Sequence, residues 1–136
     1  TFMSSDNIYE NNPLHGVKLE QVLDELVDYY GWEILYAYLN LNCFKTNVSM
    51  ASSLKFLRKT AWAQEKVEGF YMYQYKNLPR ADDEQFLLPP RDRIVPAHHK
   101  IGEPAELSIE DAEQLRQKRA KKARARNSSP ANPWGN

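Results

Sequence analysis

The chain has little cysteine and no long apolar run. Cys43 is its single cysteine, so no internal disulfide can form, and we expect a fold suited to a reducing compartment or indifferent to redox conditions. No apolar run approaches the roughly 20 residues that span a bilayer, and no secretory signal pattern opens the chain. We therefore expect no membrane partner.

Motifs for catalysis and for metal binding are also missing. The sequence contains no Gly-rich phosphate loop and no nucleophile motif. Its histidines and its cysteine lack the spacing of three or four convergent metal ligands. Glu20, Asp24 and Asp28 recur every four residues opposite an apolar stripe, which indicates a solvated helix face rather than a catalytic carboxylate cluster. We expect a protein that is not an enzyme and that holds no cofactor or metal.

Charge is balanced overall but unevenly distributed. Eighteen Lys and Arg residues match eighteen Asp and Glu residues. Acids outnumber cations nine to six in residues 1–74, whereas residues 116–126 carry seven cations and no acid. No carboxylate occurs between Glu33 and Glu65. Basic blocks of this kind usually face nucleic acid or another anion.

Four short helices are expected in the first half of the chain. An apolar stripe of helical spacing begins at Leu19, and Gly31 is expected to end that helix because glycine tolerates a left-handed conformation. A short second helix follows, and Ser49 and Thr60 are expected to cap a third and a fourth. Since so small a core is marginal alone, we expect either homodimerisation or cover from the rest of the chain.

Composition divides the chain into five segments and predicts an all-α protein. A flexible N-terminus precedes a compact four-helix domain. Prolines then forbid long helices, which predicts an extended Pro-rich arm along the core or a partner. Acids open the last helix and cations end it, the order that the helix macrodipole favours, and a disordered tail follows. The five segments span residues 1–11, 12–75, 76–107, 108–126 and 127–136.

Hydroxyl, amide and basic side chains between Asn42 and Tyr73 form a first candidate site, because such groups contact phosphate in protein–DNA complexes. Ser52, Lys55 and Lys59 share one helix face by their spacing. The basic C-terminal helix is a second candidate, in which each phosphate contact would add to the salt dependence of binding. The candidate residues are Lys45, Asn47, Ser49, Ser52, Ser53, Lys55, Arg58, Lys59 and Lys66 in the first site, and Arg116, Arg119 and Lys122 in the second.

Plainer interpretations of these residues stay open. Ordinary lysines on a solvated face explain the first candidate site equally well. A solvated tail, RNA or an acidic protein surface would suit the second. Trp62 at the start of the fourth helix is expected to be a packing residue, with stacking on a base as the alternative.

Several motifs occur in order along the first half of the chain. They are Asn12-Pro13-Leu14-His15-Gly16-Val17, Tyr30-Gly31-Trp32, Asn42-Cys43-Phe44 and the run from Ser52 to Thr60. In these motifs residues 11–73 resemble a small bacterial family, long catalogued as a conserved domain of unknown function. That family was later described as a DNA-binding four-helix domain, similar to the duplex-DNA-binding C-terminal domain of RecA recombinase. The resemblance implies a four-helix fold that binds double-stranded DNA without catalysis.

The chain departs from the family pattern at three positions. Val48 and Ala61 stand where the family commonly has proline, and Gln64 stands where a cation is common. The last difference removes one expected phosphate contact.

The leading hypothesis is a non-enzymatic, nucleoid-type protein of the cytoplasm. We expect it to bind duplex DNA mainly through phosphates, with little sequence preference. The alternative is a structural subunit of a large ribonucleoprotein or organelle complex, held by its arm and basic helix. The opening Thr1-Phe2-Met3 is compatible with Met3 as the native start and with a cleaved organelle precursor. The second case would place the protein in a matrix or stroma.

Overall fold

The computed structural model describes residues 8–45 and 48–127 and is all-α over these residues. None of the helices in this part of the chain is long and apolar enough to cross a membrane. The chain forms two compact units, Thr1–Glu106 and Leu107–Asn136. The elements in chain order are α2 (Leu19–Leu39), η1 (Asn42–Phe44), α3 (Met50–Lys59), α4 (Ala61–Phe70), η2 (Tyr71–Tyr75), α5 (Asp83–Phe86), η3 (Pro90–Asp92) and α6 (Ile109–Asn127).

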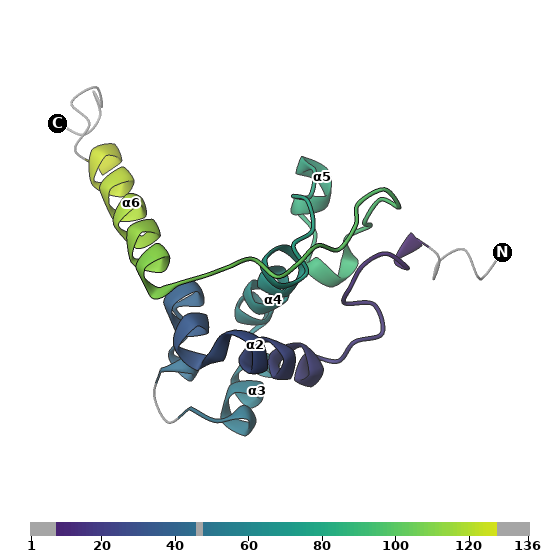
Figure 1. The fold of residues 1–136 in the computed structure, drawn as a ribbon, viewed down its shortest axis with the longest axis horizontal. Coiled ribbons are helices and arrows are strands. Elements are labelled where there is room, and N and C mark those ends of the chain that lie inside the picture. Colours follow the sequence, from purple (N-terminus) through teal and green to yellow (C-terminus); the bar gives the residue numbers. More distant parts are fainter. Residues whose placement is uncertain (1–7, 46–47, 128–136) are drawn as a thin grey trace. The chain divides into compact units, whose positions relative to one another are not determined.

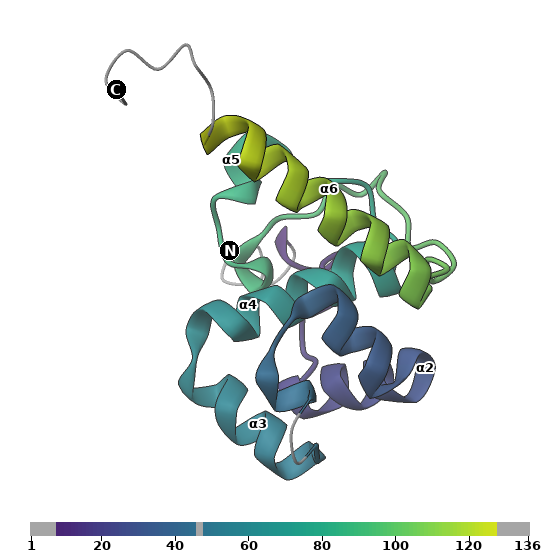
Figure 2. The same ribbon diagram turned by 90° about the vertical axis from the view of Figure 1, so that its left-hand side faces the viewer.

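Helices α2, α3 and α4 pack against one another and build the core of the first unit (Figure 1). The second view shows α3 and α4 meeting at a tight corner (Figure 2). Most of the apolar positions that helical spacing marks on these helices are buried, whereas Val27, Tyr30, Tyr38 and Met50 are half-buried. The largest fully buried side chains include Leu14, Val22, Leu23, Leu26, Leu35, Leu57, Val67, Tyr71 and Met72.

Helix α2 is broken at Gly31, at the position where the glycine was expected to end the first helix. Gly31 has φ 85° and ψ 161°, a combination open almost only to glycine. Helical geometry resumes after it and continues to Leu39. The predicted break is therefore confirmed, and the two expected helices form one kinked element.

The kink at Gly31 gives a direct stability test. Gly31→Ala is expected to lower the free energy of unfolding by about 1–3 kcal/mol, because an L side chain is strained at this φ and ψ. Gly69→Ala is the matched control. Gly69 lies inside α4, and a Cβ there would meet Pro90 at an ordinary 3.9 Å, so the change should be neutral or stabilising by up to about 1 kcal/mol. Chemical denaturation measures both, and equal losses would contradict the strain argument.

The two predicted helix caps differ. Ser49 caps α3 as expected, since its Oγ accepts a hydrogen bond from the Ser52 N–H at 3.1 Å. Thr60 occupies the cap position of α4, but its side chain makes no cap bond, so the predicted side-chain cap is wrong. One residue must both end α3 and begin α4, which leaves Thr60 at ψ 93° instead of the 158° of Ser49.

Residues 76–106 lie along the helical core and cover it. Leu78, Pro90 and Val95 are buried. The Ala105 N–H donates to the Gln74 carbonyl at 2.8 Å, and the Tyr30 hydroxyl donates to the Ala105 carbonyl at 2.7 Å. This segment thus supplies cover that so small a core needs.

Polar side chains fasten the same segment to the start of the first unit. The Asn12 side-chain amide donates to the carbonyls of Pro90 and Arg93, both at 2.9 Å. Arg91 pairs with Glu68 at 2.6 Å and also donates to the Leu14 carbonyl at 3.0 Å. Because these contacts join residues far apart in sequence, the helical core depends on residues beyond position 75.

The second unit is built on α6. Ser108 caps it, with its Oγ accepting from the Asp111 N–H at 3.0 Å. Ala112 is buried, whereas the side chains from Glu113 to Ala125 are all exposed. The helix therefore presents cations on every side. The expected tail beyond residue 127 and the first seven residues lie outside the described residues.

Candidate nucleic-acid interface

The second half of α3 carries three exposed cations. Lys55, Arg58 and Lys59 are solvent-exposed, and none of them forms an ion pair with a described residue. Lys55 and Lys59 stand four residues apart and share one face, with Arg58 beside them. Only Thr60 separates the end of α3 from the start of α4, and its side chain does not cap α4. The free backbone N–H groups at the start of a helix favour anions. We call Lys55, Arg58, Lys59 and Trp62 the corner surface.

Acids lie close to the opposite end of α3. Glu20 and Asp24 of α2 line a groove of about 430 Å³ together with Lys18, Gln21 and Met50, the first residue of α3. Carboxylates at this point repel phosphate. The hydroxyls of Ser49 and Ser52 lie 2.9 Å apart and are engaged with each other. The exposed cations of α3 therefore lie in its second half, away from these carboxylates.

Ser53 was expected to be exposed, and this expectation is wrong. The residue is fully buried, and its hydroxyl donates to the Cys43 carbonyl at 3.1 Å. The Cys43 carbonyl lies ten residues earlier in the chain, so spacing within the helix does not reveal this contact. Ser53 is a packing residue and does not belong to the surface.

Two lysines of the first candidate site make contacts within the protein. The Lys66 ammonium donates to the Leu39 carbonyl at 2.8 Å, at the end of α2, where a cation also suits the helix dipole. The Lys45 ammonium lies 5.5 Å from the centre of the Tyr36 ring. Asn47 lies outside the described residues. The structure thus brings Lys55, Arg58 and Lys59 together on α3, whereas Lys45 and Lys66 contact other parts of the protein.

Trp62 is exposed, contrary to the expectation that it packs in the core. It is 62% exposed. Its ring meets Phe56 of α3 edge to face, with centroids 6.4 Å apart. Position alone did not reveal this exposure, because the second residue of a helix can face either way. The sequence held one indication of this exposure: Ala63, the next residue, was expected to face the core and is buried.

The exposed cations of α6 form a separate charged element. Arg116 pairs with Glu113 at 3.2 Å, between two half-exposed side chains. Arg119 and Lys122 are exposed on the next turns. These residues lie on the second unit, whereas the corner surface belongs to the first.

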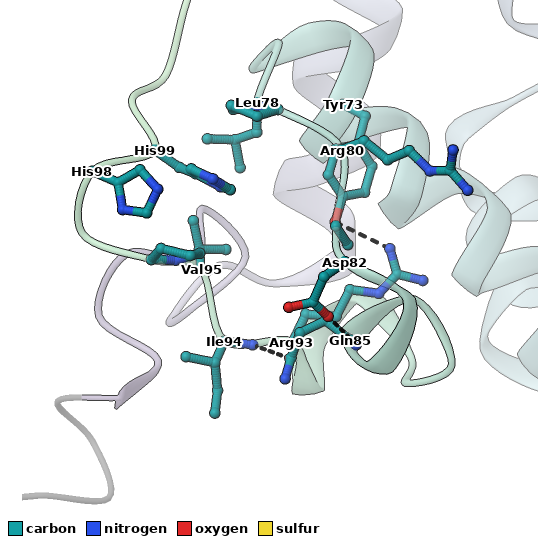
Figure 3. Close-up of a pocket in the computed structure, with 13 residues that line it drawn as sticks. Tyr73, Leu78, Arg80, Asp82, Gln85, Arg93, Ile94, Val95, His98 and His99 are labelled. Carbon is teal, nitrogen blue, oxygen red and sulfur yellow. Dashed lines mark hydrogen bonds between the residues drawn. The ribbon is translucent and has the colours of Figure 1, made fainter.

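A cavity of about 330 Å³ lies among residues 73–99 (Figure 3). Four of its polar residues, Tyr73, Asp82, Gln85 and Arg93, form hydrogen bonds that hold the segment together. Arg93 donates to the Tyr73 hydroxyl and to the Leu88 and Phe86 carbonyls at 2.9–3.1 Å. Asp82 accepts from the Gln85 N–H at 2.7 Å as the cap of α5. We therefore assign this cavity a structural role.

Burial alters the ionisation of two reactive groups in the first unit, the Cys43 thiol and the Tyr71 hydroxyl. Among the described residues no three His, Cys, Asp or Glu side chains gather to hold a metal ion. Burial raises the pKa of the Cys43 thiol, which disfavours the reactive thiolate. Burial and the Glu25 carboxylate raise the pKa of Tyr71, so its hydroxyl stays protonated and donates to Glu25 at 3.1 Å.

The described residues thus form an all-α protein in which exposed cations of α3 lie next to the corner where α4 begins. Residues 10–72 match the family described as DNA-binding protein VF530. This match covers 63 of the 136 residues of the chain. A search of curated proteins finds no match to the chain.

Proposed function

We propose that this protein binds double-stranded DNA without catalysing a reaction, through phosphate contacts and with little sequence preference. The corner surface carries the proposal, because Lys55, Arg58 and Lys59 are exposed cations without acidic partners in the described chain. Phosphate contacts of this kind position a protein on DNA but read no bases. The DNA-binding family over residues 10–72 supports the same assignment.

A salt titration of the whole chain tests the proposal. Fluorescence anisotropy of a labelled 20-base-pair duplex is measured at several salt concentrations. Each neutralised phosphate contributes about 0.9 to the slope of log K against log salt. Three contacts from the corner surface therefore contribute about −2.7, and each contact from α6 makes the slope steeper by about 0.9 more. Duplexes of unrelated sequence should bind alike. A slope near zero, or binding confined to one sequence, would contradict phosphate-dominated contact.

Helix α6 is proposed to add affinity. The change Arg116→Gln with Arg119→Gln and Lys122→Gln keeps good helix formers and removes three cations. We expect the salt slope to fall by about 2 rather than 2.7, because Arg116 already pairs with Glu113. Gln114→Ala with Gln117→Ala is the neutral control on the same helix and should leave the slope unchanged. An unchanged slope in the triple variant would exclude Arg116, Arg119 and Lys122 from the contact.

A structural subunit of a larger assembly is the second candidate function. Phe86, Leu87 and Leu88 are consecutive exposed apolar side chains, and Leu87 is 84% exposed. Such patches mark protein contacts more often than nucleic-acid contacts. Two results together would favour this candidate. The whole chain would fail to bind duplex DNA at low salt, and it would associate with another protein molecule in a way that Leu87→Ser abolishes.

A further inference from the structure

Among the exposed Phe, Tyr and Trp side chains of the described residues, Trp62 has the largest exposed fraction. Its position is defined by the edge-to-face contact with Phe56. Phe56 stands four residues after Ser52 and three before Lys59, so it lies on the polar and basic face of α3. The indole therefore borders the corner cations while its own surface faces solvent.

We propose, on the basis of the DNA-binding function above, that Trp62 stacks on an unpaired base of bound DNA. Exposed aromatic rings beside cations are the usual means of holding unstacked bases, with cations on the backbone and rings on the bases. The protein would then favour duplexes with a bulged or extrahelical base over fully paired ones.

The charges around Trp62 favour a base over a phosphate as its contact. Glu65 is exposed three residues further along α4 and lies on the same side of the helix as Trp62. A carboxylate there disfavours phosphate next to the ring, but it does not penalise a neutral base. Lys59, on the α3 side, suits the phosphate that flanks the base. This arrangement places the base on Trp62 and the backbone over α3.

Two bulged duplexes with equal charge isolate the stacking contact. One carries a single extra adenine, and the other carries an abasic nucleotide at the same place, so both have the same phosphates. The whole chain is expected to bind the adenine bulge at least about fivefold more tightly, the lower end of the range for base–aromatic stacking. Trp62→Ala should abolish this preference, and Trp62→Phe should keep part of it.

Tyr29→Ala is the matched control, because Tyr29 is an exposed aromatic residue on α2 with 55% exposure. It should leave the preference for adenine intact. Thermal unfolding of each variant checks that folding is unchanged.

The outcomes separate this inference from the function on which it rests. Equal, salt-dependent binding of both bulged duplexes by the unchanged protein would overturn the stacking inference and leave duplex binding in place. A Trp62→Ala variant that loses affinity equally for both duplexes would also overturn it, since the ring would then be a general contact. Binding to neither duplex would overturn the proposed function itself.

Discussion

Replacing Lys55, Arg58 and Lys59 together with alanine is expected to weaken duplex binding by roughly 10- to 500-fold at 0.1 M salt. Each lost phosphate contact costs up to roughly eightfold at that concentration, because counterions are no longer released. The salt slope should fall by up to about 2.7 in the same variant. The loss should be alike for all duplex sequences, since phosphates carry no sequence information. Anisotropy at four or more salt concentrations measures both quantities.

Removal of three exposed cations elsewhere in the first unit is the control. Lys18, Arg80 and Lys100 are exposed and lie outside the corner surface. Their joint replacement by alanine changes the net charge of the protein by the same amount, so it reports the general electrostatic effect. We expect less than a threefold loss in affinity. Equal losses in the two triple variants would mean that net charge, and not the corner surface, accounts for binding.

Arg91→Ala is expected to lower the free energy of unfolding by about 3 kcal/mol. Its partner Glu68 has a side chain that is only 3% exposed, whereas Arg91 itself is 32% exposed. Removal of the arginine leaves a buried carboxylate without its charge partner, which typically costs 3–5 kcal/mol. We expect the lower end, because water can reach the space that the arginine leaves. Urea unfolding followed by circular dichroism measures the change.

A second substitution identifies the buried charge as the cause. Glu68→Gln in the Arg91→Ala background removes the charge and keeps an oxygen that can accept from Gln64, whose side chain lies 3.1 Å from Glu68. This double variant should recover about 1–2 kcal/mol. Arg116→Ala breaks the exposed pair with Glu113 and should cost less than about 0.5 kcal/mol. Equal losses for Arg91→Ala and Arg116→Ala would contradict the role given to burial.

The dependence of the core on Arg91 also affects how a DNA-binding fragment should be made. A chain that ends near residue 75 would lose Arg91, along with the Pro90 and Arg93 carbonyls that Asn12 contacts. Weak binding by such a fragment would then report unfolding instead of a missing interface. Substitutions in the whole chain avoid this ambiguity.

Features that depend on near neighbours could be predicted from the sequence. The helical spacing that begins at Leu19 marks a buried face because residues three and four apart share one side of a helix. Gly31 and Ser49 act within one turn, and both behave as predicted. The exposure of Lys55 and Lys59 follows from the same spacing, as they lie away from the buried Leu54 and Leu57.

Features that depend on distant segments could not be predicted. Ser53 is buried because the Cys43 carbonyl, ten residues away, meets its hydroxyl. Lys66 is engaged because α2 ends beside it, 27 residues earlier in the chain. Trp62 is exposed because Ala63 takes the buried position at the start of α4.

The sequence by itself determined where α2, α3, α4 and α6 form, where α2 breaks and which face of α3 is basic, because each depends on spacing within a few residues. The short helix α5 within the Pro-rich segment was not predicted. Only the tertiary structure decided which of the candidate side chains remain available to a ligand. It also decided that residues near Arg91 complete the core, since Asn12 and its acceptors stand about 80 residues apart. A residue is buried when other residues pack against it, and the local sequence pattern does not specify which distant segment will make those contacts.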